Sequence, residues 1–164
     1  SAWYMRRQLE YYKTGARGAD PDDEYGLQMA PMVATLADAA AVENVIAYIR
    51  TLPDTPADTT ITGDIARGEA IYTTCGACHG WRGEGIAALN APRQAGMSDW
   101  YLARQLKNFR EGIRGSHAGD KYGKQMQMMA AILQTEDRIN DVVAYMNTLP
   151  GPEPEPNLAA LETH

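Results

Sequence analysis

The sequence predicts an all-α protein. Two segments carry apolar residues at the spacing i, i+3, i+4 and i+7, which places them on one face of a helix. The residues of these two stripes are Val42, Val45, Ile46, Ile49 and Ile139, Val142, Val143, Met146. No segment shows the sustained alternation of apolar and polar residues that is typical of a strand. We therefore expect helices joined by loops, with long loops at 80–97 and 112–124.

Three helices are expected in the first half of the chain. The first spans about 1–14. The second carries the first apolar stripe and ends at Pro53, because proline cannot continue a helix. The third begins near Thr62 or Asp64 and runs toward Cys75.

Two more helices are expected in the second half. One runs from the N-cap Ser98 to about Glu111, and Gly112 favours the left-handed turn that ends many helices. The other begins at the N-cap Thr135, carries acidic residues in its first turn, and ends at Pro150.

Composition limits the classes of function. The chain has 164 residues and a mass of 18.0 kDa, which allows one ordinary domain or two small ones. Its net charge of −6 argues against nucleic-acid binding, which requires a basic surface. Two cysteines exclude a disulfide-rich scaffold. No apolar run approaches the ~18 residues that span a bilayer, and the chain opens without a signal peptide.

The chain contains an internal repeat at an offset of 97 residues. Residues 3–53 align with 100–150 without a gap over 51 positions, of which 22 are identical. Average amino-acid usage gives roughly three identities by chance. The identical pairs include Arg7/Arg104, Gln8/Gln105, Arg17/Arg114, Tyr25/Tyr122, Met29/Met126, Met32/Met129 and Tyr48/Tyr145. A gene duplication therefore produced two copies of one unit.

The two copies are not equally complete, and this suggests four segments. Residues 1–53 correspond to the C-terminal half of a duplicated domain, and 54–62 have the turn-rich composition of a linker. Residues 63–150 form the complete unit. Residues 151–164 begin with alternating proline and glutamate, which favours an extended tail.

One short motif carries the chemistry. Residues 75–79 read Cys75-Gly-Ala-Cys78-His79, the Cys-x-x-Cys-His signature of covalent haem c attachment. The two thiols add to the vinyl groups of one porphyrin, and the histidine reaches the iron. A thioredoxin-like dithiol needs strand–helix surroundings that are not visible here. A zinc site needs further ligands, and His117 and His164 lie at no zinc-finger spacing.

The region around this motif resembles a class I cytochrome c domain. More narrowly, it is similar to one domain of the tandem dihaem cytochromes c of bacteria, and to the cytochrome c domains associated with haem–copper oxidases. The resemblance covers 63–150 in full and 1–53 as a partial copy. The runs that carry it are Gly63-Asp64-x-x-x-Gly68, Cys75-x-x-Cys78-His79-Gly80, Ala91-Pro92-Arg93, Phe109-Arg110-x-Gly112-x-Arg114-Gly115 and Gln125-Met126.

The resemblance implies one covalent haem c and a role for several residues. Cys75 and Cys78 would form the thioether bonds, and His79 would be the proximal iron ligand. The carbonyl of Pro92 would accept a hydrogen bond from His79 Nδ1, which fixes the imidazole tautomer. Gly68 would let the first helix of the domain cross the last one closely, near Tyr145. The porphyrin walls would include Trp100 and Tyr101.

Three methionines lie within reach of the sixth coordination position. Met126 and Met129 recur in the first copy, whereas Met128 does not, so Met128 is the weakest candidate. In the resembling family the ligand lies seven residues before the apolar residue that closes the loop, here Leu133, which favours Met126. Met129, and the first copy's methionines, are expected to pack in the core, and His117 is expected at the surface.

Histidine–methionine ligation stabilises reduced iron and leaves no open coordination position, so we expect an electron carrier rather than an enzyme. The alternative is a haem-based ligand-binding or catalytic domain with a vacant sixth site. The segment 104–124 carries an excess of four positive charges. These charges either steer an acidic redox partner or serve as solvated arginines, some of them bonded to the haem propionates.

The expected partners are respiratory redox proteins, including a terminal oxidase or reductase, and the chain could itself be the cytochrome c subunit of such a complex. Haem c is attached outside the bacterial cytoplasmic membrane, which indicates a periplasmic location, soluble or tethered to a membrane complex. Residues 1–53 keep the counterpart of the ligand but lack the haem motif. Their apolar helix faces are therefore expected to cover the complete domain or to form a dimer.

Overall fold

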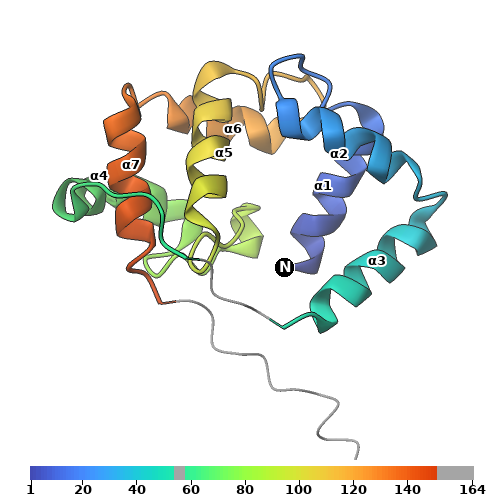
Figure 1. Ribbon diagram of the computed structural model, residues 1–164, viewed down its shortest axis with the longest axis horizontal. Coiled ribbons are helices and arrows are strands. Elements are labelled where there is room, and N and C mark those ends of the chain that lie inside the picture. The colour runs from blue at the N-terminus through green and yellow to red at the C-terminus, as the bar shows by residue number, and fades with distance from the viewer. Residues whose placement is uncertain (54–57, 151–164) are drawn as a thin grey trace, which may run out of the picture.

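The protein is all-helical, as predicted. The computed structural model describes residues 1–53 and 58–150, and this part of the chain contains seven α-helices, one 3-10 helix and no strand (Figure 1). The helices are α1 Ala2–Thr14, α2 Glu24–Ala34, α3 Ala39–Thr51, α4 Ile65–His79, η1 Ala87–Leu89, α5 Asp99–Glu111, α6 Lys121–Ala130 and α7 Glu136–Met146.

The repeat is visible in the helix limits. Shifting α1 by 97 residues reproduces both ends of α5, and α2 and α3 begin at the positions that correspond to the starts of α6 and α7. This supports the division at 1–53 and 63–150, which stays a prediction. The tail 151–164 and linker residues 54–57 lie outside the described residues.

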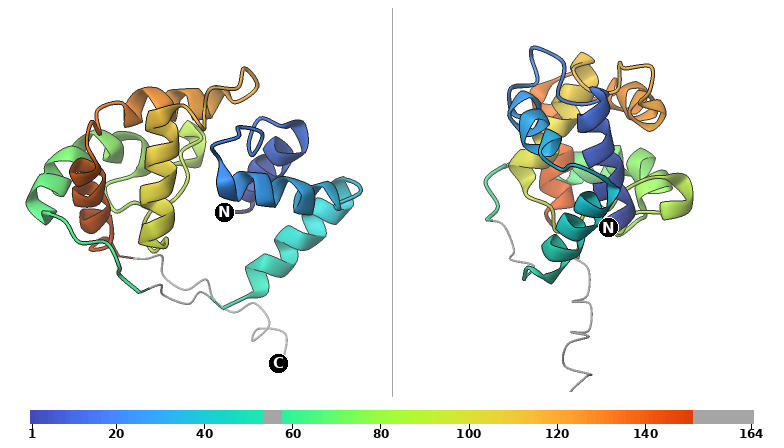
Figure 2. Two further views of the ribbon diagram at one scale, coloured as in Figure 1. Left: turned by 45° about the horizontal axis from the view of Figure 1, so that its top comes forward. Right: turned by 90° about the vertical axis from the view of Figure 1, so that its right-hand side faces the viewer.

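The helices pack in two groups. α7 packs on α4 and α5, and α5 also packs on α6, whereas α1 contacts α2 and α3. In Figure 1 and in the left view of Figure 2, α3 lies at the opposite end of the molecule from α4 and α7. Among the described residues no single helix is long and apolar enough to cross a membrane; only α2 and α3 taken together, bent by 118°, meet those criteria.

The core is built on the apolar stripe of α7. Its four residues are 0–1% exposed and pack with side chains of α4 and α5. The buried members of this cluster are Ile71, Tyr72, Leu102, Leu106, Leu133, Ile139, Val142, Val143 and Met146. Burying each such side chain contributes about 1.5–3 kcal/mol. The stripe of α3 is less complete, because Val42 and Ile46 are buried while Ile49 is 41% exposed.

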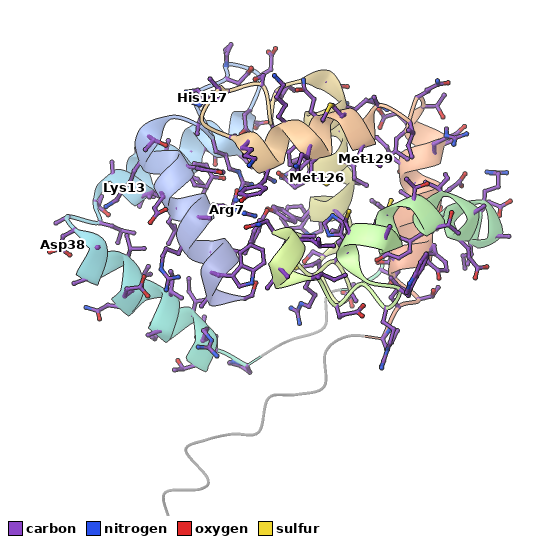
Figure 3. The ribbon with its side chains drawn as sticks, turned by 180° about the vertical axis from the view of Figure 1, so that it is seen from behind. Arg7, Lys13, Asp38, His117, Met126 and Met129 are labelled. Carbon is purple, nitrogen blue, oxygen red and sulfur yellow. The ribbon has the colours of Figure 1, made fainter. Side chains whose placement is uncertain are left out.

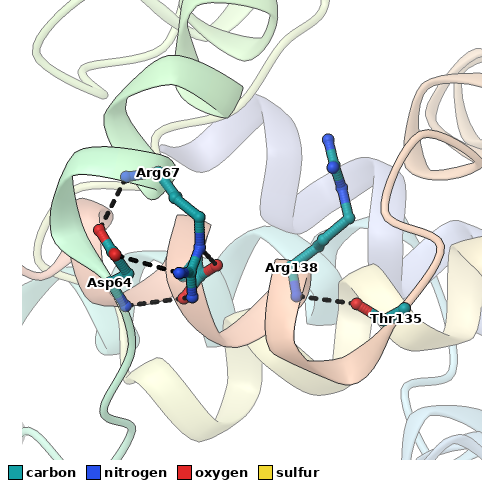
Figure 4. A network of polar contacts seen from close by, with 5 residues as sticks. Asp64, Arg67, Thr135 and Arg138 are labelled. Atoms are coloured by element: carbon teal, nitrogen blue, oxygen red, sulfur yellow. Dashed lines mark hydrogen bonds and ion pairs between the residues drawn. The ribbon is translucent and has the colours of Figure 1, made fainter.

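Helices α4 and α7 cross at Gly68, as expected. A Cβ atom there would lie 2.0 Å from the Asp141 carbonyl oxygen and 2.9 Å from Tyr145 Cβ, so only glycine permits this approach. Beside the crossing, Arg67 donates to both carboxylate oxygens of Asp141, from Nε at 2.8 Å and from Nη2 at 3.1 Å. Figure 4 shows this network, in which the Asp64 backbone also donates to Asp141 at 2.7 Å.

Two helices were not expected from the sequence. α2 and α6 begin with an aspartate cap and a glycine in the first turn, and the predicted loop 112–124 in fact ends where α6 begins. Asp23 Oδ1 accepts from Gly26 N at 3.1 Å, and Asp120 Oδ1 accepts from Gly123 N at 2.7 Å. A Cβ on either glycine would lie 2.0 Å from the capping carboxylate. These glycines, which usually weaken a helix, are required by the caps.

A reciprocal set of hydrogen bonds joins the two copies. Arg17 donates to Gln105 Oε1 at 3.2 Å, and Arg114, its repeat equivalent, donates to Gln8 Oε1 at 2.7 Å. Each arginine also donates to a tyrosine hydroxyl of the other copy. Both arginines are buried, with exposures of 9% and 5%. The first copy therefore covers the complete one through an approximately two-fold arrangement.

Candidate functional site

The C-terminal end of α4 presents the Cys-x-x-Cys-His motif. The helix continues to His79, one turn beyond the expected end, and stops because Gly80 adopts a φ of 84°. Both cysteines are free thiols; Cys75 is half-buried beside the core cluster and Cys78 is exposed. Burial raises the pKa of the Cys75 thiol to about 11, so it is a thiol at neutral pH. Two free thiols one helical turn apart fit covalent attachment of a ligand.

His79 is buried and held in one orientation. It is 5% exposed, and its Nδ1 lies 2.7 Å from the Pro92 carbonyl oxygen. A carbonyl can only accept, so Nδ1 carries the proton and Nε2 keeps its lone pair. Burial lowers the pKa of the imidazole and keeps it neutral. This is the tautomer and charge state that a metal-ligating imidazole needs.

A cavity lies between the motif, α5, α6 and α1. It contains about 680 Å³ of space not occupied by atoms, including solvent at its mouth. His79 of α4 and Met126 of α6 both line it. One part of its wall is apolar and is formed by Pro92, Met97, Leu102, Leu106 and Phe109. Figure 3 shows Arg7 and Met126 toward the middle of the molecule, whereas Lys13, Asp38 and His117 lie at its outside.

The residues expected to hold the haem do not all lie at the cavity. Pro92, Tyr101 and Met126 join His79 in its wall, and the two cysteines lie on the helix that leads to it. Trp100 is not among the lining residues. Its indole is 49% exposed and packs edge-on against Tyr101, with the Arg104 guanidinium 5.0 Å from its ring centre.

The methionines of α6 differ in their surroundings. Met126 is half-buried against the core cluster, whereas Met128 is 62% exposed and Met129 is 41% exposed. The expectation that Met129 packs in the core is wrong, because α6 turns that residue outward. The methionines of the first copy were also expected in the core, but Met29 and Met32 are 42% and 63% exposed.

His117 is exposed, as expected, and its Nδ1 accepts a hydrogen bond from Gly119 N at 3.0 Å. In residues 1–53 and 58–150, no three His, Cys, Asp or Glu side chains gather into a group that could hold a metal ion. This leaves no protein-only cluster for a structural zinc ion in the described part of the chain.

One part of the cavity wall was missed by the sequence reasoning. Its polar end is lined by Tyr4, Arg7, Asn90, Arg114, Asp120 and Tyr122. Two of these residues, Tyr4 and Arg7, belong to α1 of the first copy. The repeat gave a partial signal, because both are identical between the copies. It could not show that α1 would lie over the site of the second copy.

The sequence profile described as "Cytochrome c" matches residues 65–150, which is more than half of the chain. The chain belongs to the cytochrome c family. Proteins of this family carry electrons on covalently bound haem c, and the all-helical architecture is the cytochrome c fold. The cavity fits that group, because it pairs a neutral imidazole with a thioether sulfur between apolar walls, beside two free thiols.

Relatives cover different shares of this cytochrome c chain. Cytochrome c4 from Pseudomonas aeruginosa is 30% identical over 157 residues, covering 89% of this chain and 71% of that protein. The thiosulfate dehydrogenase electron acceptor of Stutzerimonas stutzeri is 34% identical over 97 residues, covering 54% of this chain and 41% of that protein. The solved cytochrome c4 of Acidithiobacillus ferrooxidans superposes with a TM-score of 0.70 at 27% identity, covering 91% and 84% of the two chains.

Proposed function

We propose that the chain carries single electrons through one haem c held in the cavity, with His79 and Met126 as the axial ligands of its iron. The observation that carries this proposal is that both side chains line one cavity from different helices. Cys75 and Cys78 would form the two thioether bonds. When bound, haem c supplies a one-electron couple that accepts an electron from a reduced partner and passes it to an oxidised one.

The protein's own contribution is to fix the ligands and to exclude water. The hydrogen bond from His79 Nδ1 to the Pro92 carbonyl holds the imidazole plane and strengthens its Nε2 as a donor. The Gly68 crossing fixes α4, and with it His79, against α7. The apolar wall keeps the cavity at low dielectric, which raises the energetic effect of each nearby charge.

The partners of this proposed carrier are other redox proteins. A thiosulfate-oxidising enzyme is one candidate, because a relative is named as the electron acceptor of thiosulfate dehydrogenase. Respiratory oxidases and reductases are the other class, with this chain as their soluble or tethered cytochrome c component in the periplasm. The three exposed lysines of the basic segment 104–124 (Lys107, Lys121 and Lys124) would steer such partners. Arg114 cannot do so, because it is buried.

Met126→Ala tests the ligand assignment, and Met129→Ala is the matched control on the same helix. The purified holoprotein should contain one covalent haem per chain, bind no carbon monoxide when reduced, and show a methionine–iron charge-transfer band when oxidised. Met126→Ala should lose that band and bind carbon monoxide, because an axial position opens. Met129→Ala should retain both properties.

Three results would contradict the proposal. A colourless protein would contain no haem and would contradict the electron-carrier function. Carbon monoxide binding by the unmutated protein would favour the alternative of a ligand-binding or catalytic haem with a vacant sixth site. Loss of the band in Met129→Ala, with Met126→Ala unchanged, would assign the ligand to Met129.

A further inference from the structure

The polar end of the cavity gathers positive charge. Arg7 of α1 and Arg114, which follows α5, both line this end, and Asp120 is the one carboxylate among its lining residues. Asp120 is already used as the cap of α6. In the described part of the chain, neither arginine forms an ion pair with a carboxylate. The Asp120 carboxylate interacts electrostatically with Arg114 and so offsets one positive charge, but Arg93 adds a further cation to the cavity wall. The remaining net positive charge is costly to bury, so this arrangement favours an anion in the cavity.

The Arg7 guanidinium is held in place but not fully used. It donates from Nη1 to Asn90 Oδ1 at 3.1 Å and from Nη2 to the Asn90 carbonyl at 3.0 Å. Its Cζ lies 4.6 Å from the ring centre of Tyr122 and 4.9 Å from that of Trp3. The buried Nε has no hydrogen-bond partner. The two aromatic rings and the two hydrogen bonds therefore hold a cation that keeps one unused donor.

Arg114 shows the same pattern at greater depth. It is 5% exposed and donates to Gln105 Oε1 at 2.6 Å, to Gln8 Oε1 at 2.7 Å and to the Tyr4 hydroxyl at 2.9 Å. All three acceptors are neutral, and its Nε is buried without a partner. Arg17 Nε is also buried without a partner, but Arg17 does not line the cavity. The case for a ligand therefore rests on Arg7 and Arg114, whose charges line the cavity and whose Nε donors a bound anion would satisfy.

Haem is an anion of the required shape, since its otherwise apolar ring carries two propionate carboxylates on one edge. We propose that Arg7, from the partial first copy, binds a propionate of the haem held by the second copy, together with Arg114. This inference rests on the proposed function. It gives residues 1–53 a definite role, because the first copy then supplies part of the haem site of the second, which is incomplete without α1.

The repeat supplies a matched control. Arg104 is the equivalent of Arg7 and has similar aromatic neighbours, with its Cζ 3.6 Å from the ring centre of Tyr25 and 5.0 Å from that of Trp100. It does not line the cavity. Arg7→Gln and Arg104→Gln therefore both remove a cation from equivalent tyrosine and tryptophan rings, but only Arg7→Gln removes a charge from the cavity wall. Arg7→Lys, which also loses the paired hydrogen bonds to Asn90, separates the effect of those bonds from the effect of the charge.

The reduction potential of the holoprotein, measured between pH 5 and 8, is the readout. Removing a cation favours oxidised iron, so Arg7→Gln should lower the potential and Arg104→Gln should not. At a fixed applied potential, we expect the ratio of reduced to oxidised protein to fall about ten-fold in Arg7→Gln. For a one-electron couple this equals a decrease of ~59 mV in the reduction potential. Arg7→Lys keeps the charge and should recover most of the shift.

The pH profile gives a second test that needs no variant. Paired with two arginines, the propionates should stay ionised, so the potential of the unmutated protein should be flat from pH 5 to 8. In Arg7→Gln a propionate should titrate in this range and the potential should fall as the pH rises. Other charged or titratable groups also line the cavity, and they are the same in the unmutated protein and in Arg7→Gln. They are Tyr4, His79, Arg93, Tyr101, Asp120 and Tyr122.

Haem content and the methionine–iron band are measured first on each protein. If the unmutated protein holds no haem, the proposed function fails. If haem and band are intact but Arg7→Gln behaves like Arg104→Gln, the propionate assignment alone is overturned. A slope in the potential of the unmutated protein would also overturn it, and this result is available even if Arg7→Gln does not yield holoprotein.

Discussion

Helices α3 and α7 come from one duplicated sequence but lie in different surroundings. The stripe of α7 is 0–1% exposed because α4 covers it. In the described part of the chain, α3 packs mainly on α1, and this leaves Tyr48 64% and Ile49 41% exposed. The same pattern therefore makes a helix in both places. Its energetic value depends on the partner helix, because most helical stability in proteins comes from tertiary packing.

Replacing equivalent apolar side chains of α7 and α3 by alanine should give the largest difference between the copies in the free energy of unfolding. Met146→Ala removes a side chain that is 1% exposed and should lower the free energy of unfolding by about 2–5 kcal/mol. Ile49→Ala, at the equivalent position, should change it by about 1 kcal/mol or less. Urea denaturation of the holoprotein measures both. Equal losses would mean that α3 is as well covered in solution as α7.

The exposed face of α3 also tests the dimer proposed for residues 1–53. Tyr48→Glu places a charge on that face and should raise the dissociation constant of the dimer at least ten-fold. This equals a loss of about 1.4 kcal/mol in the free energy of association. Sedimentation equilibrium of the full chain measures it, with Tyr48→Phe, which keeps the face apolar, as the control. If the unmutated protein is monomeric at every concentration, the expectation of a dimer is wrong.

The smallest expected effect is in acid stability. Hydrogen bonds from Arg67 hold the pKa of the Asp141 carboxyl below its usual value. A depressed folded-state pKa contributes stability that is present above the unfolded pKa and is lost as the pH falls through the folded pKa. Asp141→Asn should therefore make the thermal midpoint less dependent on pH below about 4. An unchanged acid slope would show that the ion pair is not maintained in solution.

The sequence predicted the parts that depend on local pattern. The stripe of α7, the cap at Thr135 and the Cys-x-x-Cys-His motif are read from neighbouring residues, and α7 begins directly after that cap. The helix ends were less accurate, because α4 continues to His79 and α7 ends at Met146, before Pro150. The fold class and family follow from the same signals. Assignment of the haem contacts to particular residues stays a proposal, although the cavity brings His79, Pro92, Tyr101 and Met126 together.

The features that the sequence did not predict depend either on one residue compensating for another or on contacts between residues far apart in the chain. α2 and α6 were missed because an early glycine looks unfavourable until its capping aspartate is seen to require it. Met129 was misplaced because methionine spacing alone does not tell which side of a helix is buried. Arg7 was missed because it reaches the cavity across 83 residues of sequence, through its contact with Asn90. No local pattern can report such a contact.

The bidentate pair between Arg67 and Asp141 has a consequence for folding. Helices α3 and α7 derive from one repeated sequence and share Val45/Val142, Ala47/Ala144 and Tyr48/Tyr145, so each offers α4 a related apolar face as the chain folds. Related segments of this kind are a known source of misassembly in repeat proteins. The first copy has Asn44 where the second has Asp141, so α3 lacks a carboxylate at the position that pairs with Arg67 in α7. One acidic group thus distinguishes the correct helix pairing from its duplicate.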